Sequence, residues 1–420
     1  MSMMSKQYAV YLPAVNSNYA SEVLKQLPAN RSFPKNLTLK DLIFWDRNNK
    51  LWHHNAILHS IGLHKYPKQV SNAISEMGKS DCLLVGDSGG YQIGGGALKG
   101  YKLLYKNQNA SDAVAVWQNA YDLKKWIVDY LEMHCDYAMT LDMPLWAKDK
   151  RNADTPFHNC SLDELTQLTV ENLQFIDAHR EGRTKWLNVI QGLDDKSTID
   201  WWNAVKWFDC SGYALAGNAG VAGGIEKVLQ ILLIMIEDGK LNHKTQWIHV
   251  LGVSTPQWAI YLTAIQKALR KKLKSEIRVS YDSSSPFRIG GVWEGICIMP
   301  TFQSKLDTWS INYEASAQSL KLFQSEEPFP YSSAIGDKLT WGDLNVKGGT
   351  WDWRTFDTIS NLILVNHNIW VYLRAFEVAN QIAFDGGDGV VPYQWASVLE
   401  LINGIFESNN GLKELAKNFK

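Results

Sequence analysis

Five short apolar runs in this sequence each lead into a residue that could do chemistry. The runs CLLVG, YAMTL and IRVSY lead into Asp87, Asp142 and Asp282, and the runs WLNVI and GYALA lead into Gln191 and Gly217. Each run is too short for a helix and is rich in residues that favour strands. If the strands are parallel, three carboxylates and an amide gather at the carboxyl end of one sheet, where active sites form on such sheets.

Asp87 and Asp282 are the candidates for catalysis. Taken alone, each is readily interpreted as a turn-capping aspartate, because Asp is common where strands enter turns. Two carboxylates at one rim, however, are what cleavage of a glycosidic bond requires. One attacks or stabilises the sugar carbon, and the other moves the proton of the departing or arriving group.

Asp142 and Gln191 have the chemistry to bind a base. A carboxylate accepts hydrogen bonds from the N–H edge of a purine, and an amide both donates and accepts, so the pair could recognise a guanine-like face. Strand-end capping is an equally ordinary role for either residue alone. Tyr91, in the glycine-rich turn after Asp87, could stack on a base, although an aromatic residue there is more often plain packing.

Strands alternate with helical stretches over most of the chain, which predicts βα units. Besides the five runs, strands are expected at 8–15, 246–253 and 295–299, and a further one is possible within 37–45. That count of about eight is what a closed barrel requires.

Helix signals and turn signals complete this pattern. Helices are expected after Ser111, after the capping box at Ser161, after Gly224, from Pro256, and over 361–383 and 392–407. The turn after Asp87 is predicted to be too long to enter a helix directly. The four histidines between 53 and 64 are interpreted as loop or groove residues, with metal ligation as the lesser alternative.

Composition sets limits on partners and on location. The net charge of −1 excludes a globally basic coat, so nucleic acid would bind only through local patches, and the 18 tryptophans suit both a core and stacking surfaces. The five scattered cysteines indicate neither a disulfide framework nor a zinc knuckle. The first residues lack the apolar core of a signal peptide, and the run 228–236 is too short to cross a bilayer. We therefore expect a soluble cytoplasmic protein with no membrane partner.

Several short segments, in this order, resemble the signature segments of the tRNA-guanine transglycosylase superfamily. They are DSGGYQ (87–92), Asp142, VIQG (189–192), GYALAG (212–217), LGVSTP (251–256) and YDSSSPFR (281–288). The stretch VNHNIWVYLRAF (365–376) is similar to the late helix of that family, which contains an HN pair. The resemblance covers roughly residues 80–380, and the order of the segments makes it specific although each one alone is weak.

The resemblance implies a (β/α)8 barrel that exchanges guanine in a nucleic acid for a 7-deazaguanine of the preQ0 or preQ1 type. By position, Asp282 matches the family nucleophile and Asp87 its general acid/base. The base-binding positions match Asp142, Gln191 and Gly217, with Ser88 and Tyr91 lining the same pocket, and Arg288 matches a position near the substrate backbone. No cofactor is implied. We expect residues 1–300 to form the barrel with its insertions, and residues 301–420 to form a helical and irregular appendage packed on it.

Two departures from the family fall on surfaces expected to hold the nucleic acid. The tRNA-acting members carry a zinc site of three cysteines and a histidine before the late helix, whereas residues 303–360 contain no cysteine. A segment with tryptophans at 309, 341, 351 and 353 stands there instead, so no zinc subdomain and no other metal site is expected. After the nucleophile segment, Ile289-Gly290-Gly291 replaces a further arginine of the family. The pattern is most similar to the phage and bacterial DNA-guanine transglycosylases, which implies DNA as the polymer and, for a phage protein, the host cytoplasm.

Three other functions stay open on the sequence. The same chemistry could act on tRNA, the barrel could be a non-catalytic nucleic-acid-binding subunit, or an unrelated barrel enzyme could bind a small phosphorylated substrate through the glycine-rich turn. The presence of both Asp87 and Asp282 speaks against a binding subunit, and the absence of a strong phosphate motif speaks against the last alternative. Partner proteins that open a duplex are also left open.

Overall fold

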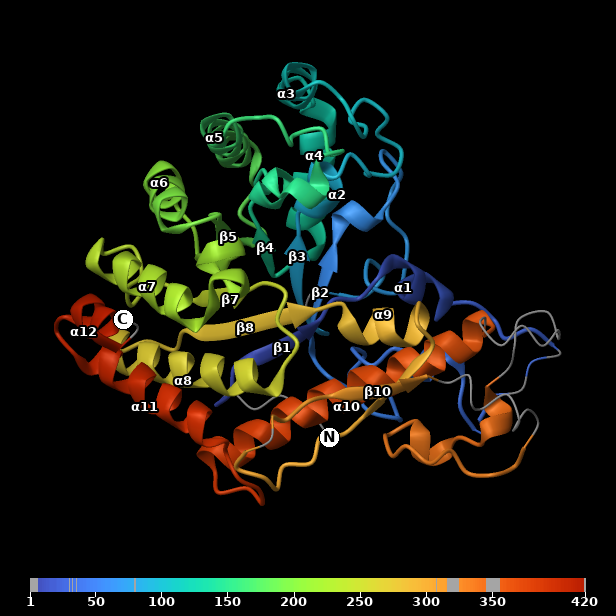
Figure 1. Cartoon of the computed structure of the whole chain (residues 1–420). Coiled ribbons are helices and arrows are strands. Elements are labelled where there is room, and N and C mark those ends of the chain that lie inside the picture. The colour runs from blue at the N-terminus through green and yellow to red at the C-terminus, as the bar shows by residue number, and fades with distance from the viewer. Residues whose placement is uncertain are drawn as a thin grey trace.

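The computed structural model describes residues 7–29, 31, 33–34, 36–78, 81–306, 308–315, 325–344 and 356–418. Eight parallel strands form one sheet in the order β1-β8-β7-β6-β5-β4-β3-β2. They are β1 (Val10–Pro13), β2 (Ala56–Ser60), β3 (Leu83–Asp87), β4 (Tyr137–Met139), β5 (Lys185–Ile190), β6 (Gly212–Leu215), β7 (Trp247–Val250) and β8 (Arg278–Ser283). A parallel bridge between Ala14 and Leu58 joins the two end strands and closes the sheet, so the fold is the (β/α)8 barrel that the sequence predicts (Figure 1).

Helices surround the barrel in chain order. They are α1 (Ser17–Glu22), α2 (Gly90–Gly94), α3 (Ala110–Gln118), α4 (Tyr121–His134), α5 (Leu162–His179), α6 (Asp195–Val205), α7 (Gly224–Glu237), α8 (Pro256–Leu273) and α9 (Ser285–Gly291). Local signals in the sequence place several starts correctly: Ser161 and Glu164 form the predicted capping box of α5, and Pro256 is the first residue of α8 behind the cap Thr255.

The core has two layers because each strand points alternate side chains to opposite faces. One cluster fills the inside of the barrel and includes Val10, Leu12, Leu187, Val189 and Trp247. A larger cluster fills the space between the strands and the helices. The sheet is therefore buried on both faces.

Three further helices extend the outer layer at the carboxyl end of the chain. They are α10 (Thr358–Phe384), α11 (Tyr393–Glu407) and α12 (Gly411–Asn418). The long helix α10 packs on α8 and α9, α11 packs on α8, and α12 packs on α7 (Figure 1). In the preceding segment, Trp309 is buried against Phe302 and Trp395, so it serves packing. Trp351 and Trp353 lie outside the described residues.

Buried polar side chains of α10 hold the chain that follows the β8 loop. The amide of Asn368 accepts from the Cys297 N–H at 2.8 Å and donates to the Gly295 carbonyl at 3.0 Å. His367 contacts the Cys297 carbonyl at 2.9 Å, and burial lowers the pKa of His367 to about 4, so its ring is neutral. The HN pair that the sequence analysis singled out is thus part of a structural clamp on residues 295–297.

The strand predicted at 295–299 is not part of the barrel. It forms β9 (Gly295–Ile298), which pairs antiparallel with β10 (Asn312–Ala315) in a separate two-stranded sheet. A short apolar run does not specify which sheet it joins, because that choice depends on tertiary partners. The predicted number of barrel strands is correct, but the assignment of 295–299 to the barrel is wrong.

The barrel strand that was not predicted is β2, which lies in the histidine-rich stretch interpreted above as loop or groove. The strand has only three apolar residues before His59, which is fully buried and whose Nδ1 lies 2.7 Å from the Val15 carbonyl oxygen. That hydrogen bond makes a histidine acceptable in the core. Residues 37–45, where a strand was possible, contain the 3-10 helix Leu39–Leu42 instead.

Two local expectations are also corrected. The glycine-rich turn after Asp87 enters a helix at once, because α2 begins at Gly90. The helix expected after Ser111 is two helices, α3 and α4, separated at 119–120, and Asn109 is the cap of the first. Asn and Ser are comparable as caps, so the sequence does not decide between neighbours.

Within the described residues, none of the helices combines the length and the apolar character that a membrane crossing requires. All five cysteines are free, and four of them are buried.

Candidate active site

A cavity of about 490 Å³ opens at the carboxyl end of the barrel, a volume within the usual range for small-molecule sites. Six of the residues predicted from the sequence line it: Asp87, Tyr91, Asp142, Gln191, Gly217 and Asp282. They lie at or just after the ends of β3, β4, β5, β6 and β8. The closed barrel brings these strand ends to one rim, as expected for parallel strands.

Asp282 is held by one of its two carboxylate oxygens. Its side chain is 13% exposed, and Oδ1 accepts from the Gly252 N–H at 3.0 Å and lies 3.2 Å from Nε2 of His249. In the part of the chain that the structure describes, both hydrogen bonds to Asp282 end on Oδ1. The carboxylate is therefore oriented by one oxygen while the other, Oδ2, is available to react.

Asp87 has a carboxyl group that holds a proton more tightly than usual. Burial raises its pKa and the nearby charge of Asp282 adds to the rise, while hydrogen bonds from the Ser60 hydroxyl and the Gly89 backbone N–H oppose it. Gly89 has φ +84°, and a Cβ there would lie 2.7 Å from the Gly62 Cα, so only glycine fits this turn. A carboxyl group in this state suits general acid–base work.

Asp142 and Gln191 form a tight pair in the cavity wall. Nε2 of Gln191 donates to Oδ2 of Asp142 at 2.6 Å and to the Met143 carbonyl at 3.0 Å, and Oε1 accepts from the Leu145 N–H at 2.9 Å. The amide is thereby fixed, and both of its hydrogens are engaged. Burial and the charge of Asp87 raise the pKa of Asp142 to about 7.

At Gly217 the backbone lies so close to the backbone of Gly192 that a side chain would not fit. Its φ is +54°, and a Cβ would lie 2.6 Å from the Gly192 carbonyl oxygen. The next residue, Asn218, donates its backbone N–H to that same oxygen at 2.9 Å. The loop after β6 is therefore pressed against the loop after β5, and both line the cavity.

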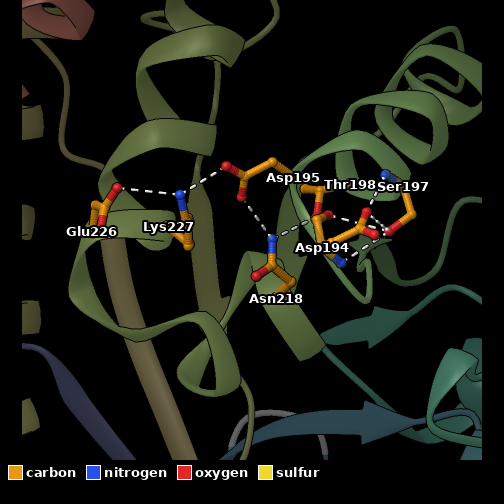
Figure 2. Close-up of polar contacts among 7 residues, drawn as sticks. All are labelled: Asp194, Asp195, Ser197, Thr198, Asn218, Glu226 and Lys227. Carbon is orange, nitrogen blue, oxygen red and sulfur yellow. Dashed lines mark hydrogen bonds and ion pairs between the residues drawn. The ribbon is translucent and has the colours of Figure 1, made fainter. Parts of the chain in front are cut away.

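Asn218 lines the cavity but was not among the predicted residues. Its Nδ2 donates to Oγ1 of Thr198 at 3.0 Å and to Oδ1 of Asp195 at 3.3 Å, and Lys227 donates to Oδ2 of Asp195 at 2.8 Å (Figure 2). These contacts join the first turns of α6 and α7 to the loop that carries Gly217. Because they lie far apart in the sequence, no local pattern indicates them.

Tyr91 lies at the mouth of the cavity. Its ring is 69% exposed and stacks on Trp146, with the ring centroids 4.8 Å apart. Trp146 belongs to the 3-10 helix Leu145–Lys148, and it lines the cavity together with Asp149 and Arg151. The structure therefore supplies a second aromatic ring that the sequence analysis missed.

Two predicted residues do not line the cavity. Ser88 is buried and its hydroxyl donates to the Thr140 carbonyl at 3.2 Å. Arg288 is exposed on α9, with its guanidinium 5.2 Å from the ring centroid of Trp293. The hydroxyl of Ser88 is thus engaged by the backbone next to the site, and Arg288 belongs to a surface beside it.

The chain does not fit the zinc site of the tRNA-acting transglycosylases. Cys297 is the cysteine nearest in sequence to α10, and it is buried within β9. Among the residues that the structure describes, no group of three or more histidine, cysteine or acidic side chains is arranged to hold a metal ion.

Comparison with known proteins gives no family. No protein-family model matches the chain, and no curated protein matches it. Among solved structures, the xylanase 10B CBM22-1–GH10 modules of Clostridium thermocellum, complexed with xylohexaose, align with a TM-score of 0.38 and 10% identity over 66% of this chain and 59% of that chain. The β-glucosidase of Pyrococcus furiosus aligns with a TM-score of 0.35 and 10% identity over 95% and 98%. Likeness this distant bears on no function, and the class of fold rests on the strand order itself.

Proposed function

We propose that this protein is a guanine transglycosylase that exchanges guanine in DNA for a 7-deazaguanine base. The observation that carries the proposal is the cavity that Asp87 and Asp282 share with the Asp142–Gln191 pair. Two carboxyl groups with different environments supply a nucleophile and an acid/base. The third carboxyl group, which the amide holds in place, supplies hydrogen-bond acceptors for a base.

In the first half of the reaction, Oδ2 of Asp282 attacks C1′ of the target nucleotide. The bond from C1′ to N9 breaks, its electron pair goes to the departing guanine, and Asp87 donates a proton to that guanine. The product is a glycosyl ester of Asp282 with inverted configuration. The target nucleotide must leave the base stack first, because C1′ is not accessible to a side chain inside a duplex.

In the second half, the 7-deazaguanine replaces guanine in the same pocket. Asp87, now ionised, removes the proton from N9 of the incoming base, and N9 attacks C1′ while Asp282 departs. Asp87 ends protonated, as it began, and two inversions give net retention. The raised pKa of Asp87 suits a group that must both donate and recover this proton.

The base is recognised by groups in the cavity wall around Asp142 and Gly217. Ionised Asp142 can accept from the N1–H and the exocyclic amine of a guanine edge, and the backbone of the Gly217 loop offers further polar groups. Guanine and 7-deazaguanines share that edge and differ at position 7. One pocket therefore suits both the departing and the arriving base, while the rings of Tyr91 and Trp146 offer a stacking surface.

A surface beside the nucleophile loop suits the polymer. Trp293 and Tyr313 are 48% and 49% exposed and stack with their centroids 5.9 Å apart, and Arg288 lies over Trp293. We name Arg288, Trp293 and Tyr313 the aromatic platform. Exposed aromatic rings with an adjacent arginine are typical of surfaces that bind unpaired nucleotides. DNA is favoured as the polymer because the two departures from the tRNA-acting family lie in this part of the chain.

Transfer of labelled guanine or 7-deazaguanine into polymer tests the proposal, with duplex DNA and unmodified tRNA offered in parallel. We expect label in DNA, and we expect Asp282→Ala to abolish it while Asp200→Ala, which changes an exposed aspartate on α6, does not. Label in tRNA alone would retain the chemistry and overturn the choice of polymer. Label in neither polymer, with nucleic-acid binding retained, would indicate a binding subunit.

A further inference from the structure

The inside of the barrel is polar beneath Asp282, where β7 and β8 lie side by side. Trp247 and His249 on β7 alternate with outward-facing residues, as do Arg278, Ser280 and Asp282 on β8. Trp247, His249 and Ser280 are almost completely buried. Buried polar side chains in a barrel core are unusual enough to require an explanation.

These side chains form one continuous chain of contacts that ends on the carboxylate. The Arg278 guanidinium lies 5.2 Å from the ring centroid of Trp247, and Nε1–H of Trp247 donates to Oγ of Ser280 at 2.6 Å. Oγ of Ser280 lies 2.8 Å from Nδ1 of His249. Nε2 of His249 then lies 3.2 Å from Oδ1 of Asp282.

The donors in this chain fix the tautomer of the histidine. Indole N–H can only donate, so Ser280 accepts from Trp247 and keeps its own hydrogen for another acceptor. A carboxylate can only accept, so Nε2 of His249 must carry a hydrogen. The neutral ring that satisfies both ends has Nδ1 bare, accepting from Ser280, and Nε2–H donating to Asp282.

We propose that His249 is a positioning residue for the nucleophile, set in its Nε2–H tautomer by Ser280 and Trp247. With the Gly252 N–H it anchors Oδ1 of Asp282 and turns Oδ2 toward the sugar. The inference rests on the proposed function, since it assigns a role in that reaction. After attack, Oδ1 becomes the carbonyl oxygen of the glycosyl ester, so both donors keep their acceptor through the intermediate.

A neutral donor at this place has a chemical advantage. The groups that face His249 are Asp282 above it, Ser280 and Trp247 beside and below it, and Asp87 across the cavity. An uncharged N–H orients the carboxylate without adding a formal positive charge that would weaken it as a nucleophile. His249 can therefore orient the carboxylate of Asp282 without neutralising its negative charge.

Two substitutions test this role. His249→Gln can keep a donor near the position of Nε2, whereas His249→Leu removes it. We expect His249→Leu to lower kcat about 100-fold, the size typical for loss of one preorganised donor, and His249→Gln to stay within about 10-fold of the native rate. KM for base and polymer should be unchanged in both, because His249 touches neither.

The control is His243→Leu, which changes an exposed histidine in the loop before β7 and should leave the rate unchanged. Equal losses in the Gln and Leu variants, or full activity of His249→Leu, would overturn the positioning role. A rise in KM without a fall in kcat would overturn it as well.

Nitrogen-15 NMR of histidine-labelled native protein tests the geometry without any turnover. We expect the His249 signals, assigned by their loss in His249→Gln, to report a neutral ring with Nε2 protonated and Nδ1 bare. An imidazolium or the Nδ1–H tautomer would overturn the inference even if the enzyme is active. If the native protein transfers no base, the proposed function fails and the role in catalysis fails with it, whereas this spectrum still decides whether Ser280 and Trp247 set His249 in the Nε2–H tautomer that donates to Asp282.

Discussion

Asp142, which we propose binds the base, also affects stability. Its pKa of about 7 lies well above the value of about 4 for an unfolded chain, because the cavity buries it near Asp87. The folded protein therefore binds this proton more tightly than the unfolded chain. The resulting stabilisation is complete below about pH 4 and is lost as the pH rises through 7.

Asp142→Asn should therefore stabilise the protein at high pH. We expect the free energy of unfolding to exceed that of the native protein by on the order of 1–3 kcal/mol at pH 8, because no charge is buried, and the gain to shrink toward pH 5. Urea unfolding at several pH values measures this. Asp200→Asn, on the exposed surface, should show no such trend, and a gain independent of pH at position 142 would contradict the assigned cause.

The strand-end residues were predictable because chemistry and position coincide in the sequence. Asp87, Asp142 and Asp282 each follow an apolar run, and parallel strands must bring such positions to one rim. His249 was not predicted, because it lies inside a strand and has a polar partner only across to β8. The available signal is a histidine at an inward position of a buried strand.

Among the elements, helix α9, which follows Asp282 and the end of β8, is tied to the C-terminal helices. Helix α9 packs on α10, and α10 also holds β9 through Asn368. The aromatic platform lies where these elements meet, on Arg288 of α9, Trp293 after it, and Tyr313 of β10. The C-terminal segment thus helps to shape the surface beside the site.

Substitution of Trp293 and Tyr313 by alanine should weaken polymer binding without slowing the chemistry. We expect KM for the polymer to rise roughly 10-fold or more, since stacking contributes about 1–3 kcal/mol per base, with kcat and the KM for the free base unchanged. Anisotropy of a labelled single-stranded oligonucleotide measures the binding directly.

Trp207→Ala is the matched control for the aromatic platform, because Trp207 is 44% exposed and follows α6. It should bind the oligonucleotide as the native protein does. If the platform variant and the control bind the oligonucleotide with equal affinity, the aromatic platform does not contact the polymer.

The strands that sequence alone misassigned have a common physical cause. The run 295–299 and β2 are both short, and a strand of that length is decided by its partners and not by its own pattern. The capped helices α5 and α8 were predictable because Ser161 and Pro256 act locally.

In the molecule as a whole, buried polar side chains bear on the proposed reaction in two places. One is the cavity at the carboxyl ends of the strands, and the other is the chain of contacts inside the barrel that ends on Asp282. With a net charge of −1, the molecule offers no general attraction for a polyanion, so binding depends on local surfaces. Both places include the same carboxylate, that of Asp282.

The most direct test of the account is to trap the glycosyl ester. The native protein is mixed with DNA in the absence of incoming base, quenched in denaturant, digested with nuclease and trypsin, and analysed by mass spectrometry. We predict release of guanine and a deoxyribosyl nucleotide adduct on the tryptic peptide 279–288, VSYDSSSPFR, localised to Asp282 and discharged when a 7-deazaguanine is added. Release of guanine with no adduct on that peptide, or an adduct on Asp87, would contradict the assignment of Asp282 as the nucleophile.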